Sequence, residues 1–176
     1  MLRPFAIADV DALTAALQDD EIARWTLTPV PFHREHAVFF VEAAYPDGWR
    51  EDRMYMFGAF TRQGAHLVGA VGLSVRGVGV CEIGCWVAAE HRGNGYAAEA
   101  LRAALRWAFG YLVASRVEWL AITGNDDSTK LATRLGFRFE GVLRSRIDQR
   151  GFHRDAWLAG LLPADLAAAD TANDER

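Results

Sequence analysis

Residues 91 to 101 read HRGNGYAAEAL, with two glycines and an arginine directly ahead of an alanine-rich helical pattern. Glycine destabilises a helix interior but suits a backbone that turns tightly or approaches a ligand closely. A helix N-terminus has unpartnered N–H groups and a partial positive charge, so it attracts an anion, and Arg92 adds to that charge. The stretch therefore predicts either a simple helix start or a cradle for phosphate groups.

The same glycines also fit a dinucleotide site. Gly93, Gly95 and Ala98 match the spacing G-x-G-x-x-G/A, and Glu118 follows at about the right distance for a ribose-binding acid. Glu118 is expected inside a strand, however, whereas that acid should stand at a strand's end. The loop also follows three antiparallel-looking strands, and the remaining chain is too short for a doubly wound sheet. We therefore reject NAD as the ligand.

Composition and charge exclude several classes of partner. The chain has 176 residues, 51% of them hydrophobic, and a formal net charge of −4. One domain is expected, with no global attraction to nucleic acid or to an anionic membrane. The N-terminal residues lack the pattern of a signal peptide, and no stretch approaches the roughly 20 apolar residues of a membrane span. These observations predict a cytoplasmic protein.

The two cysteines, Cys81 and Cys85, lie four residues apart in a strand-like segment. A strand rises about 3.3 Å per residue, so their separation of roughly 13 Å is too long for a disulfide. A metal site needs more ligands than this pair offers nearby. We expect free thiols in a reducing compartment and no metal.

Hydrophobic periodicity divides the chain into strands and helices. Strands are expected at 2–7, 54–60, 66–75, 78–87, 115–122, 137–146 and 152–161. Helices are expected at 9–19 with Asp9 as the cap, at 34–44, after the glycine loop and at 125–135, with turns at 45–48, 62–65 and 149–151. The glycine loop then lies where a strand feeds a helix that leads to another strand, which is a common place for a ligand.

Two longer stretches carry a family resemblance. They are EIGCWVAAEHRGNGYAAEALRAALRWAF, residues 82 to 109, and NDDSTKLATRLGFRFEGVLR, residues 125 to 144. Together with the opening LRPFAIADVDALTAALQDDEIARWT they resemble the GNAT superfamily of N-acetyltransferases, specifically its RimJ/RimL-type branch, over residues 2 to 162. Arg92, Gly95 and Ala97 match the family signature R/Q-x-x-G-x-G/A.

The resemblance implies a mixed α/β fold of the GNAT type, with a mostly antiparallel sheet splayed at its centre and helices on both faces. Residues 1–165 would form a single acetyltransferase domain, and residues 166–176 a frayed tail. Acetyl-CoA would lie in the splay, with its pantetheine arm paired to the strand at Trp86 and Val87. The other cofactor-binding residues implied are Arg92, Gly93, Asn94, Gly95, Tyr96, Ala97, Asn125 and Ser128.

Glu82 is the candidate general base. Strand alternation places Glu82, Gly84 and Trp86 on one face, and Gly84 leaves room above the sheet for a substrate. The resemblance implies that the matching glutamate acts through a water. The competing interpretation is a solvated or ion-paired glutamate. A backbone N–H near Trp86 or Val87 is expected to hold the oxyanion.

Ser128 is the candidate proton donor to the departing thiolate. Many family members use a tyrosine in this helix, but Ala132 occupies that position here, and Cys85 replaces a second tyrosine of the family pattern. The family's alternative donor is the serine. A helix-capping hydroxyl in the first turn is an equally supported interpretation of Ser128.

The sequence says less about which amine accepts the acetyl group. The resemblance favours the N-terminal α-amine of a protein or peptide. A small amine such as a polyamine, an amino acid or an antibiotic is an alternative, and a catalytically silent acyl-CoA-binding module is a third. Aromatic side chains near the acceptor side are more typical of core, and Asp148 and Asp155 could attract a cationic amine. A homodimer is left open as the assembly.

Overall fold

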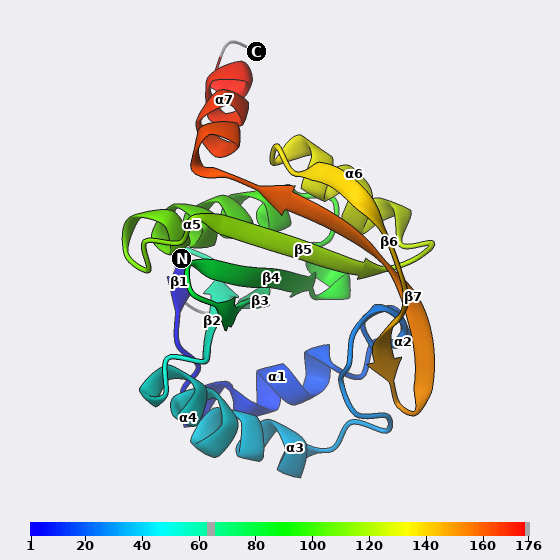
Figure 1. Cartoon of the computed structure of the whole chain (residues 1–176). Helices are drawn as coiled ribbons and strands as arrows, with labels where there is room; N and C mark the ends of the chain where they lie inside the picture. Colours follow the sequence, from blue (N-terminus) through cyan, green and yellow to red (C-terminus); the bar gives the residue numbers. More distant parts are fainter. Residues whose placement is uncertain (63–65, 175–176) are drawn as a thin grey trace.

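The computed structural model describes residues 1–62 and 66–174 and contains one sheet with helices on both faces (Figure 1). The sheet order is β1-β2-β3-β4-β5-β7-β6. Its strands are β1 (Leu2–Arg3), β2 (Met54–Phe60), β3 (Leu67–Gly77), β4 (Val80–Val87), β5 (Arg116–Ile122), β6 (Arg138–Gln149) and β7 (Phe152–Leu161). The turn expected at 62–65 falls largely outside the described residues.

Four of the helices lie between β1 and β2, and the others follow β4, β5 and β7. The helices are α1 (Val10–Ala16), α2 (Asp20–Trp25), α3 (Arg34–Phe39), α4 (Tyr45–Arg50), α5 (Tyr96–Gly110), α6 (Asp126–Arg134) and α7 (Pro163–Asp174). Short 3-10 turns cover Ile7–Asp9 and Ala89–His91, and a π-helical turn covers Phe40–Ala44. The expected order of the strands is confirmed, and so are the helices expected after β4 and β5.

Two hydrophobic cores lie on opposite faces of the sheet. The larger one packs α5 and α6 against the sheet and includes Leu73, Ile83, Leu105 and Leu161, none more than 1% exposed. The smaller core joins the N-terminal helices to the other face. Figure 1 shows α1, α3 and α4 on one side of the sheet and α5 and α6 on the other. Strand alternation therefore decides which side chains of β4 face which core.

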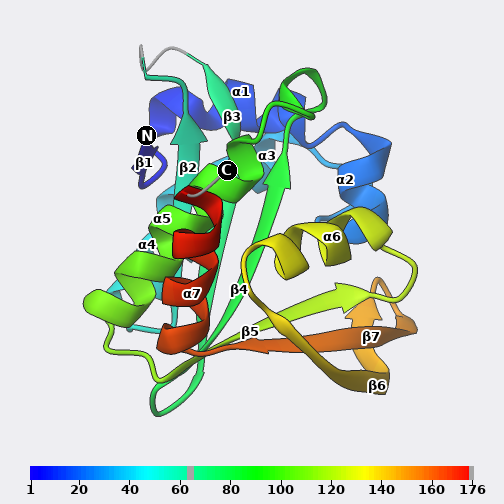
Figure 2. The ribbon, with the colours of Figure 1, turned by 90° about the horizontal axis from the view of Figure 1, so that it is seen from above.

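Strands β4 and β5 are the parallel pair of the sheet, and they soon separate. Residues 80–83 pair with residues 116–119, whereas β4 continues to Val87 and β5 to Ile122. Figure 2 shows the two strands diverging from this point. Beyond it β4 stays with β3, and β5 stays with β7 as far as Ile122 opposite Ala156. The expected splay is present.

The first helix differs from its expected form. The Asp9 carboxylate does not cap α1. It accepts hydrogen bonds from the Ala6 N–H (2.8 Å) and from Arg3 (2.7 and 2.8 Å). Helix α1 ends at Ala16, and a separate helix, α2, begins after Asp19, whose Oδ1 accepts from the Glu21 N–H (2.8 Å). A short polar helix of this kind leaves little periodicity in the sequence.

Two segments expected to be irregular are helical. The predicted turn at 45–48 is wrong, because Tyr45–Arg50 forms α4, which continues directly from the π-helical turn and has Pro46 among its first two residues. We expected fraying after residue 165, but Pro163–Asp174 forms α7. Leu166 is buried there, and Asp170 pairs with Arg102 and Arg106 of α5 at 3.3 and 2.8 Å.

Leu105 tests the larger core. Its side chain is fully buried beneath the sheet, so Leu105→Ala should lower the free energy of unfolding by about 2–5 kcal/mol. Urea denaturation followed by circular dichroism measures this loss. Leu162→Ala, at a position 47% exposed, is the control and should cost less than about 1 kcal/mol. Equal losses for the two variants would contradict the assignment of the core.

Candidate active site

The glycine loop takes a backbone conformation that only glycine adopts readily. Gly93 and Gly95 have φ values of +78° and +80°, and a Cβ atom at either position would have no heavy atom within 4 Å. Gly95 caps α5, and the first bond of the helix runs from the Glu99 N–H to the Gly95 carbonyl (3.1 Å). The N–H groups of the first turn, at residues 96–98, therefore have no acceptor within the helix. An exposed, open anion cradle is the result.

Two side chains fix the loop. Asn94 Nδ2 donates to the carbonyls of His91 (3.2 Å) and Arg92 (3.0 Å). Arg92 Nε donates to the Val87 carbonyl (3.2 Å), and its guanidinium forms an ion pair with Asp19 at the start of α2. Arg92 thus ties the cradle to the end of β4 and to the N-terminal helices.

The separated half of β4 offers one free edge. Residues 84–87 pair with β3, in register with residues 72–69, on one side. Within the described residues no strand pairs with them on the side that faces β5. Backbone N–H and C=O groups at such an edge can pair with an extended, amide-containing ligand. Trp86 and Val87 lie on this edge, next to the loop.

The sheet face beside that edge is open. Gly84 is exposed, and a Cβ atom there would have nothing within 4 Å. Its partner on β3 is Gly72, where a Cβ atom would lie 2.8 Å from the Met56 methyl group. Gly84 and Gly72 thus form an open floor on this face of the sheet. By strand alternation, Glu82 and Trp86 lie on the same face, on either side of Gly84. The room predicted above Gly84 is therefore present.

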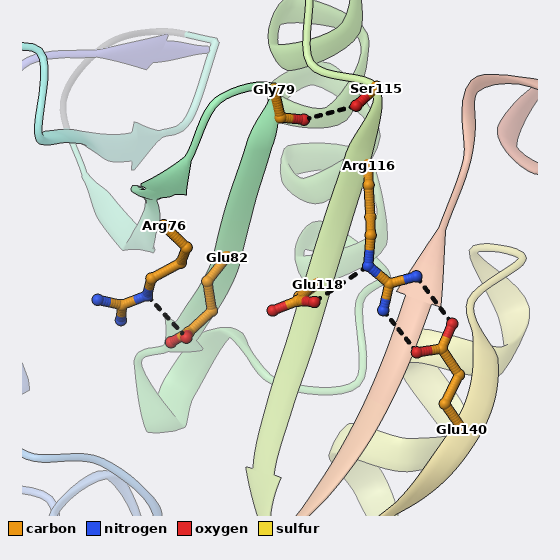
Figure 3. Close-up of polar contacts among 7 residues, drawn as sticks. All are labelled: Arg76, Gly79, Glu82, Ser115, Arg116, Glu118 and Glu140. Atoms are coloured by element: carbon orange, nitrogen blue, oxygen red, sulfur yellow. Dashed lines mark hydrogen bonds and ion pairs between the residues drawn. The ribbon is translucent and has the colours of Figure 1, made fainter.

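Glu82 is half-buried and ion-paired. Arg76 Nε lies 3.0 Å from Glu82 Oε2 (Figure 3). The competing interpretation of Glu82 as an ion-paired glutamate is therefore partly realised, although a carboxylate keeps further lone pairs for a substrate or water. Glu118 of β5 lies beside it in register. The structure brings these two carboxylates together at the point where the strands separate.

Asn125, rather than Ser128, supplies the cap of α6. Asn125 Oδ1 accepts from the Ser128 N–H (3.2 Å). Within the described ranges the Ser128 hydroxyl itself makes no hydrogen bond, and its side chain is half-buried. Ala132 lies one turn further along the same helix face and is buried in the core. The capping interpretation of Ser128 is therefore wrong, and its hydroxyl is left available.

Cys85 faces away from the open floor. It alternates with Gly84 and Trp86 and packs with the core beneath α5. Burial raises the pKa of its thiol to about 12, so the thiol stays protonated at neutral pH. Cys81 and Cys85 are both free, as expected.

Side chains expected on the acceptor side, the aromatic Trp49 and the aspartates Asp148 and Asp155, have structural roles. Trp49 packs against Tyr55, Phe57 and Trp107 in one aromatic cluster. The two aspartates near the last hairpin accept backbone hydrogen bonds instead of lying free: Asp148 from the Gly151 N–H and Asp155 from the Ser145 N–H, each at 2.8 Å.

Comparison with known proteins agrees with this geometry. Residues 1–138 match the family model described as an acetyltransferase (GNAT) domain. The chain belongs to the GNAT family of acetyltransferases. It is therefore an acyltransferase with the expected GNAT fold.

Individual relatives span nearly the whole GNAT chain. An uncharacterized N-acetyltransferase, YoaA of Bacillus subtilis, is 28% identical over 153 residues, or 86% of each chain. The structure of a putative ribosomal-protein-serine acetyltransferase from Vibrio cholerae superposes with a TM-score of 0.82 at 26% identity, over 92% of both chains. Spermidine N-acetyltransferase from Vibrio cholerae, in complex with CoA and spermine, has the same fold with a TM-score of 0.80 at 20% identity, over 95% and 97%.

The residues present fit the acetyl-CoA that GNAT enzymes use. The open cradle suits a pyrophosphate, and the free edge of β4 suits the amides of a pantetheine arm. Across residues 1–62 and 66–174, no three His, Cys, Asp or Glu side chains are grouped to hold a metal ion. In the same residues no helix is both long and apolar enough to cross a membrane.

Gly95→Trp tests the cradle. The indole should fill the open space over the N–H groups at residues 96–98 and abolish CoA binding, measured by calorimetry, while circular dichroism shows the fold retained. Gly151→Trp is the matched control, because Gly151 has φ +83° and equally open space in the last hairpin. Unchanged affinity in Gly95→Trp, or an equal loss in Gly151→Trp, would contradict the assignment.

Proposed function

We propose that the chain transfers the acetyl group of acetyl-CoA to the N-terminal α-amine of a protein or peptide. The observation that carries the proposal is the free edge of β4, lying between an open anion cradle and the exposed floor at Gly84. The ribosomal-protein acetyltransferase among the similar structures supports the choice of acceptor. We place the reaction in the cytoplasm, since free thiols suit a reducing compartment.

The α-amine also suits the chemistry of the site. An α-amino group titrates near 7.7–8.0, so a useful fraction is neutral at physiological pH, whereas a lysine near 10.4 needs a stronger base. Glu82 is an ion-paired carboxylate, which is a weak base and therefore better suited to deprotonating an α-amine than a lysine. It takes the amine proton through a water, as the family resemblance implies.

Groups around the splay stabilise the oxyanion, protonate the leaving sulfur and bind the pyrophosphate. The bound thioester supplies the acetyl group. A backbone N–H at Trp86 or Val87 stabilises the negative charge that develops on the carbonyl oxygen. Ser128 donates a proton toward the sulfur, since its hydroxyl has no other partner in the described part of the chain. The N–H groups of the glycine loop hold the pyrophosphate, with Arg92 at its edge.

A small cationic amine is the second candidate acceptor. The net charge of −4 favours a cationic substrate. A silent acyl-CoA-binding module is the third candidate, supported by the loss of two family tyrosines at Cys85 and Ala132. A screen for free CoA thiol, with N-terminal peptides, polyamines and amino acids as acceptors, separates the three. Turnover on peptides confirms the proposal, whereas turnover only on small amines, or CoA binding without turnover, overturns it.

Glu82→Gln tests the base. Loss of the carboxylate should lower kcat/KM about 10²-fold or more and remove the dependence of kcat on an acidic group, with CoA affinity unchanged. Glu42→Gln, at an exposed position outside the site, is the control. A pH profile identical to that of the wild type would show that Glu82 is not the base.

A further inference from the structure

Charged side chains form a row across the sheet where β4 and β5 begin to separate. Glu82 and Glu118 are direct register partners on these parallel strands. Neighbouring strands lie about 4.8 Å apart, and paired residues project to the same face. Two carboxylates at this spacing repel one another. The charge beside Glu82 therefore depends on the cations that pair with each carboxylate.

Each glutamate is in contact with an arginine (Figure 3). Arg76, at the end of β3, pairs with Glu82 at 3.0 Å. Arg116 of β5 donates from Nε to Glu118 Oε1 at 3.0 Å. No positive charge is shared between the two carboxylates in these contacts. Arg76 therefore pairs with Glu82, whereas Arg116 pairs with Glu118 and also with a third carboxylate, that of Glu140.

Arg116 is anchored from its far side. Its Nη1 and Nη2 atoms donate to the two carboxylate oxygens of Glu140 on β6, at 2.8 and 2.5 Å. These contacts raise the pKa of Arg116 and lower that of Glu140. The bidentate contact fixes the plane of the guanidinium, so that its Nε points at Glu118.

Gly160 makes this anchor possible. Strand β7 lies between β5 and β6, and Gly160 is the register partner of Glu118. A Cβ atom at Gly160 would collide with the Arg116 guanidinium and with the Glu140 carboxylate. The absence of a side chain lets the guanidinium lie across β7. Glycine is required here for close approach rather than for its backbone angles.

We propose that Arg116 is a positioning residue of the acetyl-transfer reaction. Held over Gly160 by Glu140, it holds the Glu118 carboxylate through Nε and offsets its charge, which limits the repulsion that Glu118 exerts on Glu82, the proposed base. The inference rests on the proposed role of Glu82 as base. The charged groups that the described contacts place around Glu82 are Arg76 on β3, Glu118 and Arg116 on β5, and Glu140 on β6.

Carbon-13 NMR titration of the glutamate carboxyl groups tests the proposal directly. The Glu82 signal is assigned by its loss in Glu82→Gln. In Arg116→Met, Glu118 carries an uncompensated charge, so the midpoint of the Glu82 titration should rise by about one pH unit. The acidic limb of the kcat profile should rise with it.

Three further variants separate charge from structure. Arg116→Met combined with Glu118→Gln removes the like charge and should return the midpoint to its wild-type value. Gly160→Ala keeps every charge but displaces the guanidinium, so it should shift the midpoint in the same direction as Arg116→Met. Arg138→Met is the matched control, because Arg138 pairs with Asp165 (2.6 Å) near the same sheet edge, and it should change nothing.

An unchanged Glu82 midpoint in Arg116→Met overturns the inference and leaves the base role of Glu82 standing on its own test. A shift that persists in the double variant also overturns it, because the cause is then structural. A shifted midpoint without any change in the kcat profile overturns the base role instead. If Arg116→Met does not fold, Glu118→Gln alone decides, since it should leave the midpoint at or below the wild-type value and a rise overturns the proposal.

Discussion

Strands β4 and β5 are hydrogen-bonded over only four residue pairs, and the rest of the site depends on where that pairing stops. Beyond it, the edge of β4 keeps N–H and C=O groups without a strand partner in the described residues. The glycine loop then starts α5 directly beyond that edge, with unpartnered N–H groups of its own. The site therefore offers two adjacent sets of unpaired backbone groups: the edge of β4 can pair with amides of a ligand, and the start of α5 can bind an anion.

The separation follows from what each strand packs against. The second half of β4 is bonded to β3, where Gly72 and Gly84 stand opposite one another, and the second half of β5 is bonded to β7. Each half-sheet carries its own contacts with helices, and the natural twist of strands carries the two halves apart. The separation is part of two ordered half-sheets. The space between the ends of β4 and β5 therefore exists before a ligand binds.

Local patterns were sufficient to predict the loop, the strand face and the helix start from which we build the proposed cofactor site. The loop glycines, the alternation of Glu82, Gly84 and Trp86, and the helix start at Asn125 each leave a signal within a few residues. Helix α2 was missed because it is short and polar and leaves little periodicity, and the helix at Tyr45–Arg50 because its first four residues are typical of a turn. Arg116 and Gly160 left no readable signal, since their meeting with Glu140 joins three strands that are distant in sequence.

Hydrogen–deuterium exchange with and without CoA tests the central claim most directly. If CoA lies along the free edge of β4 with its pyrophosphate on the glycine loop, binding should slow amide exchange at residues 84–87 and at residues 93–98. The β6–β7 hairpin provides the internal reference and should exchange at an unchanged rate. Saturation with CoA that leaves exchange at both stretches unaltered would contradict the account.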